Sequence, residues 1–303
     1  MKKLDKAIVI LGPTASGKTA LSLSLADKFN GEIVSADSRQ IYREMDIGTA
    51  KPTAQEMGEI KHHLIDIKNP DEDYTVAEFK NDAITAINDI TKRKKLPIIA
   101  GGTGLYISAL VDNLDIPRVG GHKKIRAKLE KEIEKYGLDF VYKKLLELDP
   151  EAAYIVDPKN PRRVIRALEV ALATGKSFTS QRKKGKPLFN FLQIGLNPPP
   201  EKLKKRIADR VAQMIKDGLV KEVKEMIKKY RHNYKTFDTI GYREIIDYLD
   251  KKITLDEATA QITKNTRHYA RRQITWLKRD KRIKWVKNPE KIKNEVGVFL
   301  NSY

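Results

Sequence analysis

The segment at residues 7–19 constrains the chain most, because a short apolar run leads directly into a glycine-rich loop. The run 7–11 reads AIVIL, as expected of a buried strand, and GPTASGKT at 12–19 matches the pattern G-x-x-x-x-G-K-[ST]. Glycine at the two fixed positions lets backbone amides approach phosphate oxygens closely, while Lys18 supplies a positive charge and Thr19 a hydroxyl for Mg²⁺. The apolar spacing after the loop predicts a helix, whose N-terminal dipole favours the same anion. The predicted phosphate-binding residues are Gly12, Pro13, Thr14, Ala15, Ser16, Gly17, Lys18 and Thr19.

Composition indicates a polyanionic partner. The 303 residues include 60 Lys and Arg against 40 Asp and Glu, a formal net charge of +20. Such a balance is typical of a protein that meets nucleic acid. A lysine-rich proteome could produce the same total, and much of the charge lies in mixed Lys/Glu segments such as 123–135. The location of the charge must therefore decide between a nucleic-acid partner and a generally lysine-rich proteome.

The chain contains no cysteine, which excludes disulfides and cysteine-based zinc sites. The pair His62-His63 is the nearest approach to a metal motif, but neighbours on a strand point to opposite faces, so we expect one buried and one exposed histidine. The apolar run at the N-terminus is too short for a signal peptide or a membrane span. We expect a cytoplasmic enzyme with no membrane contact.

Strand candidates alternate with helical segments along much of the chain. Apolar runs predict strands at 32–35, 63–67, 97–100, 191–196 and 282–286, and helical spacing predicts helices near 19–29, 75–95, 104–112, 201–229 and 255–280. This alternation favours βα units, a parallel sheet with helices on both faces, and a ligand site beyond the carboxyl ends of the strands.

Residues 117–190 interrupt that alternation. The segment 117–121 is typical of a linker, and the residues after it are charged and have helical spacing. We therefore expect an α/β protein with a P-loop NTPase-like parallel sheet flanked by helices. Its catalytic core comprises residues 1–116 and 191–303, with an inserted helical subdomain at 117–190.

Two strand ends carry polar residues that could take part in chemistry. Asp37 follows the strand next to the phosphate loop, where it could act as a general base or serve as a helix N-cap. The strand at 97–100 leads into GGTGLY, in which Thr103 offers a hydroxyl or a cap. The glycines there permit close approach of a ligand, although a plain turn would also need them.

Basic residues recur at helical spacing in three places. Arg162 and Arg166 share one side of a helix that opens at a proline, with Val164, Leu168 and Ala171 packed on the other side. Arg206 and Arg210 share a face beside a stripe of Ile207, Val211 and Met214. Lys264, Arg267, Arg271 and Lys278 form a third stripe, with Ala270, Ile274 and Leu277 adjoining it and with Tyr269 and Trp276 about opposite. Each stripe could contact phosphates or be a solvated face.

Eight segments together resemble the tRNA dimethylallyltransferases along nearly the whole chain. They are GPTASGKT at 12–19, SADSRQIY at 35–42, GTAKP at 48–52, HHLID at 62–66, GGTGLY at 101–106, PRRVIRALE at 161–169, IGYRE at 240–244 and RRQITWLK at 271–278. Eukaryotic members carry a C-terminal zinc finger, which a chain without cysteine cannot form. The resemblance is therefore to the compact bacterial type.

The resemblance implies transfer of a dimethylallyl group from dimethylallyl diphosphate to N6 of the adenine just 3′ of the anticodon in tRNA, with Mg²⁺ and with release of pyrophosphate. It assigns Asp37 as the base, Thr103 as an active-site hydroxyl, Lys18 and Arg210 as ligands of the diphosphate, and Thr19 as the Mg²⁺ ligand. The tRNA contacts that it implies are Asp37, Ser38, Arg39, Gln40, Thr103, Arg126, Pro161, Arg162, Arg163, Val164, Ile165, Ile240, Gly241, Tyr242, Arg243, Glu244, Arg271, Arg272, Gln273, Ile274, Thr275, Trp276, Leu277 and Lys278.

Other functions fit parts of the sequence. The phosphate loop alone would suit a small-molecule kinase that binds ATP, and a basic ATP-binding protein could bind RNA without catalysis. Transfer to a free adenine nucleotide would need no basic helices. We expect the tRNA enzyme, acting as a monomer.

Overall fold

The computed structural model describes residues 4–116, 122–181, 183–230, 235–286 and 289–302. The chain forms two compact units, the core unit of Met1–Val111 with Leu188–Tyr303 and the insert unit of Asp112–Pro187. The sequence-based boundaries, 117 and 190, lie a few residues further along the chain at both ends. The segment expected to act as a linker, 117–121, lies outside the described residues.

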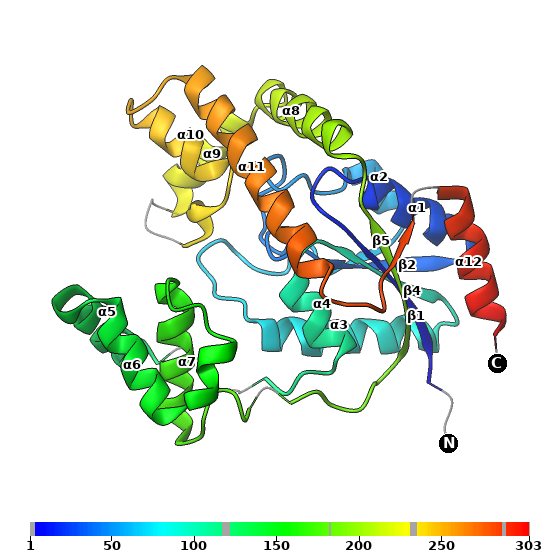
Figure 1. Cartoon of the computed structure of the whole chain (residues 1–303). Coiled ribbons are helices and arrows are strands. Elements are labelled where there is room, and N and C mark those ends of the chain that lie inside the picture. The colour runs from blue at the N-terminus through cyan, green and yellow to red at the C-terminus, as the bar shows by residue number, and fades with distance from the viewer. Residues whose placement is uncertain (1–3, 117–121, 182, 231–234, 287–288, 303) are drawn as a thin grey trace. The chain divides into compact units, whose positions relative to one another are not determined.

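The core unit is built on a parallel sheet of six strands in the order β3-β2-β4-β1-β5-β6. Figure 1 labels four of them, β1, β2, β4 and β5. The strands are β1 (Lys6–Leu11), β2 (Gly31–Ala36), β3 (His62–His63), β4 (Leu96–Gly101), β5 (Asn190–Leu196) and β6 (Lys284–Val286). Each pair of neighbouring strands in this sheet is parallel, so the carboxyl ends of the strands meet at one edge. The α/β fold expected from the sequence is confirmed.

One strand prediction is largely wrong. The expected strand at 63–67 ends after His63, because Leu64 and Asp66 have φ angles of 61° and 55°. Left-handed backbone cannot continue a strand. The apolar residues that suggested a strand instead lie in a loop that runs beside Gln40 and Ile41, whose carbonyls accept from the amides of Asp66 and Ile67.

Helices cover both faces of the sheet and extend beyond one of its ends. They are α1 (Lys18–Lys28), α2 (Ala54–Glu59), α3 (Val76–Lys92), α4 (Gly104–Val111), α8 (Pro200–Lys216), α9 (Leu219–Tyr230), α10 (Tyr242–Leu249), α11 (Leu255–Leu277) and α12 (Pro289–Asn301), with a short 3₁₀ turn at Lys235–Asp238. The single helix expected at 201–229 is two helices, because Gly218 has a φ of 99° between them. Helix prediction missed α2, α10 and α12.

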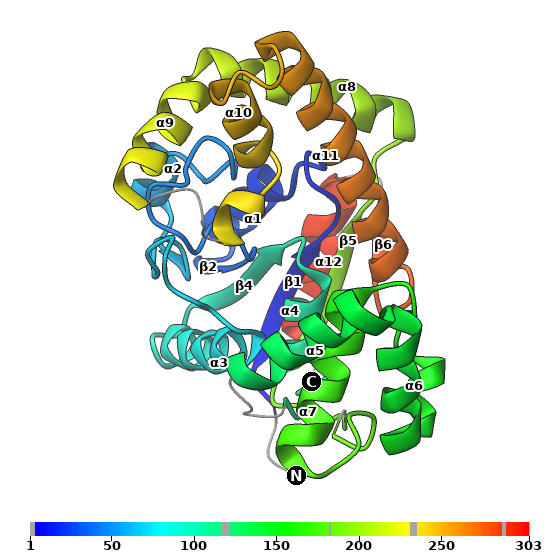
Figure 2. The same cartoon turned by 90° about the vertical axis from the view of Figure 1, so that its left-hand side faces the viewer.

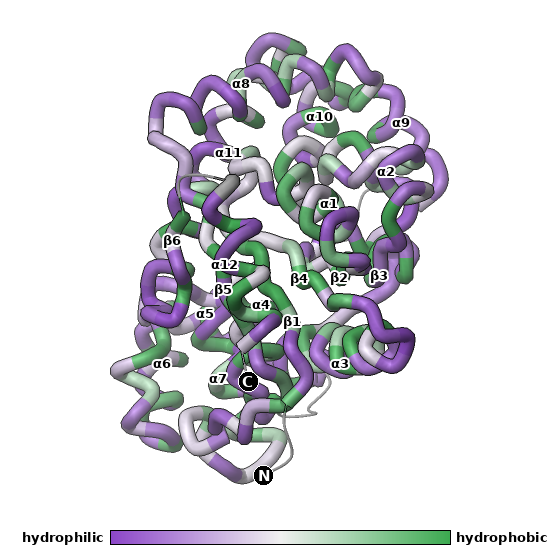
Figure 3. Tube along the Cα trace, turned by 90° about the vertical axis from the view of Figure 1, so that its right-hand side faces the viewer, coloured by the Kyte–Doolittle hydropathy of each residue, from purple (hydrophilic) through white to green (hydrophobic). Residues whose placement is uncertain are grey.

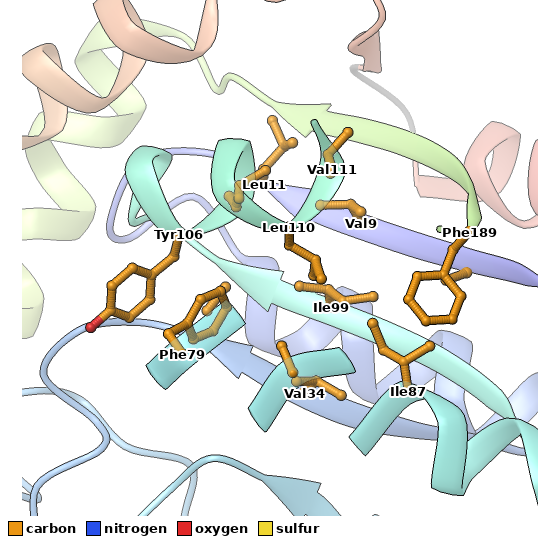
Figure 4. Packing of buried hydrophobic residues seen from close by; sticks show 14 of the residues in the cluster. Val9, Leu11, Val34, Phe79, Ile87, Ile99, Tyr106, Leu110, Val111 and Phe189 are labelled. Carbon is orange, nitrogen blue, oxygen red and sulfur yellow. The ribbon is translucent and has the colours of Figure 1, made fainter. Parts of the chain in front are cut away.

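Alternation along the strands divides the apolar side chains between two layers. Ala7, Val9 and Leu11 pack with α3 and α4, whereas Ile8 and Ile10 pack on the side that α1 and α12 cover. Figure 4 shows the first layer, in which Val9 and Ile99 meet Leu110 of α4. In Figure 3 the central strands are green and the outer turns of α8 are mainly purple. The central strands of the sheet are therefore buried on both faces.

A third cluster of buried side chains lies among helices α8 to α11, which gather at one end of the strands (Figure 2). Its largest completely buried side chain is that of Tyr242. Ile207 and Val211 of α8 are buried there as the sequence pattern predicted, and Ile41 and Met45 join them from the segment after β2. This cluster fixes α8 and α11 beside the strand ends.

The insert unit comprises α5 (Lys123–Tyr136), α6 (Leu138–Leu148), a 3₁₀ turn (Pro150–Tyr154) and α7 (Pro161–Thr174) around its own core. Helix α7 begins at a proline as predicted, with Asn160 accepting from the amide of Arg163 at 3.2 Å. Glu169 is fully buried in this unit and accepts hydrogen bonds from Arg126 and Arg166, both at 2.9 Å. Arg166, for which the sequence left phosphate contact and a solvated face open, is half-buried and paired with Glu169.

Candidate active site

A cavity of about 600 Å³ opens at the carboxyl end of the sheet, entirely within the core unit. It lies where doubly wound α/β proteins bind their ligands. The predicted site residues that line it are Thr14, Ala15, Ser16, Gly17, Lys18, Thr19, Asp37, Ser38, Arg39, Gln40, Arg210, Ile240, Gly241, Arg243, Arg272 and Gln273. Residues far apart in the sequence therefore meet at one site.

The phosphate loop connects β1 to α1 and takes its shape from two glycines. Gly17 has a φ of 97°, and a Cβ on Gly12 would lie 2.5 Å from the carbonyl oxygen of Leu196 in β5. Gly12 therefore serves the packing of adjacent strands, and neither it nor Pro13 lines the cavity. Their carbonyls accept from Nζ of Lys18 at 3.0 and 2.7 Å. The carbonyls of the loop thus hold the ammonium group of Lys18.

The charge on Lys18 is strongly affected by its surroundings. Burial lowers the pKa of its ammonium group to about 8, although the negative charge of Asp37 opposes the shift and the positive charge of Arg210 adds to it. Burial also lowers the pKa of Arg210, and Arg206 contributes to that shift. Cations that destabilise one another in this way are stabilised by a bound anion. The site is electrostatically prepared for phosphate groups.

Helix α8 brings two arginines to the phosphate loop. Arg210 donates to the hydroxyl of Thr14 at 3.4 Å, and Arg206 donates to the carbonyl of Ser16 at 3.3 Å. The sequence pattern placed both on one face of the helix but only Arg210 among the site residues. Helical spacing was the signal that could have added Arg206.

Asp37 lies in the turn that follows β2. Its Oδ1 accepts from the amide of Arg39 at 2.9 Å, and residues 38–40 form a turn, with no helix starting there. The alternative role as a helix N-cap is therefore wrong. The side chain is half-buried and lines the cavity that Lys18 and Arg210 also line.

Thr103 lies beside this turn, although it is outside the lining of the cavity. Its hydroxyl oxygen accepts from the amide of Ser38 at 3.1 Å, and a hydrogen bond joins it to Tyr269 of α11. Burial and the charge of Asp37 raise the pKa of Tyr269 to about 12, so the phenol stays protonated at neutral pH. Sequence reasoning missed Tyr269, which it placed opposite the basic stripe of the helix. The position of Tyr269 opposite the basic stripe is the sequence signal that could have identified it.

Helix α11 packs its Gln273 between the phosphate loop and β4. The buried amide accepts from the amide of Thr14 at 2.8 Å and donates to the carbonyl of Gly102 at 3.0 Å. A Cβ on Gly102 would lie 2.2 Å from Nε2 of Gln273, and one on Gly104 would lie 2.1 Å from the ring of Trp276. Because Gly102 and Gly104 have no side chain, α11 can pack closely against the segment that follows β4.

The other predicted contacts in α11, and Lys278 directly after it, fall into a buried group and an exposed group. Ile274, Trp276 and Leu277 pack into the hydrophobic clusters of the core unit. Arg271, Arg272, Thr275 and Lys278 lie toward solvent, and Arg272 alone of these lines the cavity. Arg267 is half-buried, and its Nε has no hydrogen-bond partner in the described part of the chain.

The segment 240–244 presents only part of itself to the cavity. Arg243 is exposed at the cavity, whereas Tyr242 is buried behind it. Glu244 is also buried and accepts from the amide of Gly241 and from Asn265, both at 2.8 Å. The acid and the tyrosine thus shape the segment, and Arg243 is its exposed cation.

The insert unit holds the other predicted tRNA contacts. Pro161, Arg162 and Arg163 are exposed at the start of α7, while the side chains of Val164 and Ile165 are buried in the core of the unit. Arg126 is engaged with Glu169. Any contact of Val164 or Ile165 with RNA would have to use the backbone.

Among the described residues no group of three His, Asp or Glu side chains could hold a metal ion. His62 and His63 are both half-buried, so the expected division into one buried and one exposed histidine is wrong. They lie on an edge strand, where neither face is fully covered, and His63 is within 2.8 Å of Glu32. Thr19 lies at the cavity.

Comparison with known proteins identifies the family. A model described as IPP transferase matches residues 40–280. The tRNA dimethylallyltransferase of Caldanaerobacter subterraneus is 47% identical over 284 residues, covering 92% of this chain and 90% of the relative. That of Halothermothrix orenii is 48% identical over 283 residues, covering 92% and 86%.

Solved structures agree with the sequence comparison. The tRNA isopentenylpyrophosphate transferase of Bacillus halodurans superposes with a TM-score of 0.72 at 40% identity, covering 98% of this chain and 95% of the other. A eukaryotic dimethylallyltransferase acting on tRNA gives a TM-score of 0.76 at 33% identity, covering 90% and 70%. The fold and site define a P-loop-type α/β transferase. This chain belongs to the IPP transferase family.

Proposed function

We propose that this chain is a tRNA dimethylallyltransferase. It transfers the dimethylallyl group of dimethylallyl diphosphate to N6 of the adenine 3′ to the anticodon. The observation that carries the proposal is the cavity in which the ammonium of Lys18, the guanidinium of Arg210 and the carboxylate of Asp37 meet beside the phosphate loop. A diphosphate needs the cations, and an acceptor amine needs the carboxylate.

The chemistry is a substitution at the first carbon of the prenyl group. N6 of adenine forms the new C–N bond, the C–O bond to the diphosphate breaks, and pyrophosphate leaves with the bonding electrons. Asp37 accepts the proton that N6 loses. The amides at 14–19, Lys18 and Arg210 stabilise the charge that develops on the leaving group. Thr103, through Ser38 and Tyr269, supports the turn that carries Asp37.

Mg²⁺ fits the donors of this site as a substrate-bound ion. Magnesium in phosphate-transfer sites is held by one or two protein oxygens together with phosphate oxygens and water. The hydroxyl of Thr19 supplies such an oxygen, and a cage of carboxylates is not required. The ion would neutralise part of the charge on the departing diphosphate.

A tRNA anticodon stem-loop is the acceptor that the exposed cations favour. Arg243 and Arg272 line the cavity, and Arg271 and Lys278 extend the basic surface along α11. In the insert unit, Arg162 and Arg163 are exposed at the start of α7. Adenine would leave its stack to reach Asp37. We expect the enzyme to act as a monomer in the cytoplasm, where its substrate is.

None of the described helices combines the length and the apolar content needed to cross a bilayer.

The alternative function to be tested against this proposal is that of a small-molecule kinase, because such an enzyme would use the same loop to bind ATP.

The test is to incubate the protein with an anticodon stem-loop, Mg²⁺ and either dimethylallyl diphosphate or ATP, digest the RNA, and analyse the nucleosides by mass spectrometry. We expect isopentenyladenosine with the prenyl donor only. Hydrolysis of ATP without prenylated nucleoside would contradict the proposal.

A further inference from the structure

The loop Asp46–Ala50 and the side chain of Glu222 form a junction that the reaction described above does not use. Glu222 lies in the first turn of α9, far from the loop in sequence. Its Oε2 accepts from the amides of Asp46 and Ile47 at 3.0 and 2.7 Å. Its Oε1 accepts from the amide of Gly48 at 3.1 Å. One carboxylate therefore gathers three successive backbone amides.

Tyr242 completes the junction from α10. Its hydroxyl donates to Oε1 of Glu222 at 2.6 Å, and its ring is completely buried. A Cβ on Gly48 would lie 2.4 Å from that ring, so the loop rests directly on it. Helices α9 and α10 pack against each other, as Figure 2 shows. The loop is held by charge from one helix and by contact with the other.

The opposite side of this loop is a wall of the active-site cavity. Gly48, Thr49 and Ala50 line the cavity together with Asp37. The side-chain amide of Gln40 donates to the carbonyl of Ala50 at 3.1 Å, and its oxygen accepts from the hydroxyl of Ser35 at 3.1 Å. The loop is thereby tied to the turn that follows β2. A displacement of the loop would change the position of Gln40 and of the turn that carries Asp37.

We propose that Glu222 is a positioning residue for the transfer reaction. It touches no substrate and acts by holding the loop Asp46–Ala50 in the shape that sets the cavity wall and Gln40 beside Asp37. Hydrogen bonds from several donors to one ionised carboxylate are strong and directional, so they suit this task better than apolar packing does. The inference rests on the proposed function for its kinetic consequence, and its structural part can be tested without catalysis.

The variant Glu222→Gln keeps the size of the side chain but replaces one acceptor oxygen with an NH₂ group that faces donors. We expect kcat at saturating substrates to fall about tenfold or more, because small misplacement of reacting groups is costly. We expect the Kd for the tRNA stem-loop to stay within about twofold of wild type, since the basic surface is unchanged. Glu225→Gln is the matched control, because Glu225 is exposed on the same helix.

Amide hydrogen exchange gives the readout that does not depend on activity. We expect the amides of Asp46, Ile47 and Gly48 to exchange faster in Glu222→Gln, and those of α9 to keep their wild-type rates. If wild type makes no prenylated product, the proposed function fails while this exchange result still stands or falls by itself.

Gly48→Ala tests the same claim if Glu222→Gln does not fold. The added methyl group would press on Tyr242 and move the loop without altering the carboxylate. We expect the same loss of kcat. Wild-type kcat in a folded variant would overturn the proposal. So would a loss of activity that only follows the fraction of unfolded protein, or unchanged exchange at 46–48.

Discussion

Strand β2 carries a carboxylate at each end, and the two carboxylates have opposite surroundings. Glu32, near the start of the strand, is buried and bound by Arg93, by Lys95 at 3.0 Å and by His63 at 2.8 Å. Asp37, just after the end, is half-buried and accepts from a backbone amide. The carboxylate of Glu32 is therefore paired with side chains of the protein itself, whereas Asp37 lines a cavity.

The pKa shifts follow the same division. Hydrogen bonds from Arg93, above all, hold the pKa of Glu32 well below its usual range, which means that the folded state stabilises its charge. In the cavity that Asp37 lines, burial lowers the pKa of Lys18, the first residue of α1, to about 8, which means that the folded state destabilises that charge. A charge that the fold stabilises contributes to folding, whereas a cation that the fold destabilises would be stabilised by a bound anion. The comparison thus separates a structural cluster at the start of β2 from the cavity beyond its end, which Asp37 and Lys18 both line.

The largest effect is expected from Asp37→Asn. Removing the base should lower kcat by about 10² or more, while the Kd for the tRNA stem-loop stays close to that of wild type. Single-turnover product formation measures the first quantity, and filter binding measures the second. Asp209→Asn, an exposed change on α8, is the control. Near-normal turnover of Asp37→Asn would remove Asp37 from the mechanism.

Lys18→Met should lower kcat/KM for the prenyl donor by about 10², because it removes a cation aimed at the leaving group. In wild type, pyrophosphate affinity should be highest below the pKa of about 8 and should fall as the pH rises through it, since the ammonium then loses its proton. Calorimetric titration at several pH values measures this profile. A variant whose pyrophosphate affinity keeps the wild-type pH dependence would show that another group titrates. Lys28→Met, exposed at the end of α1, is the control.

The sequence predicts the parts of this site whose contacting residues lie close together along the chain. The phosphate loop, β2 and the turn at Asp37 are predictable because their patterns are local. Gln273 was named only through resemblance, and its bond to the amide of Thr14 joins positions 259 residues apart. Glu222 lay outside the prediction, because an acid in a charged amphipathic helix is indistinguishable from a solvated one until the fold brings the loop to it.

Glu32→Gln should affect stability and not chemistry. We expect a loss of about 1.5–3 kcal/mol at pH 7, the usual range for hydrogen bonds to a charged group, with kcat per folded molecule unchanged. The stabilisation is present above the unfolded pKa of Glu, about 4.3, and is lost as the pH falls toward the lower folded value. The difference between wild type and variant should therefore narrow in acid. Urea unfolding at pH 7 and pH 3 measures it.

A matched control for Glu32→Gln is Glu130→Gln, an exposed change on α5. Loss of kcat in folded Glu32→Gln protein would mean that the two ends of β2 are coupled and would break the comparison.

The smallest effect is expected from Arg271→Ala with Lys278→Ala, two exposed residues near and directly after the C-terminal end of α11. Affinity for the tRNA stem-loop should fall, and the slope of log affinity against log salt should become shallower by about 0.7–0.9 for each phosphate that the variant no longer neutralises. Affinity for dimethylallyl diphosphate should not change. The double variant Lys61→Ala with Lys92→Ala, exposed beside the amino ends of β3 and β4, is the control. If the Arg271/Lys278 and Lys61/Lys92 double variants have equal salt slopes, the basic stripe of α11 is an ordinary solvated surface.

The central claim is that the open end of β2 is where a prenyl diphosphate meets one adenine of tRNA. The most direct measurement is nuclease mapping with mass spectrometry on two anticodon stem-loops, one natural and one with guanine in place of the adenine 3′ to the anticodon. We predict a single prenyl group on that adenine in the natural RNA and none in the substituted RNA. Prenylation elsewhere, or equal product from both RNAs, would contradict the account.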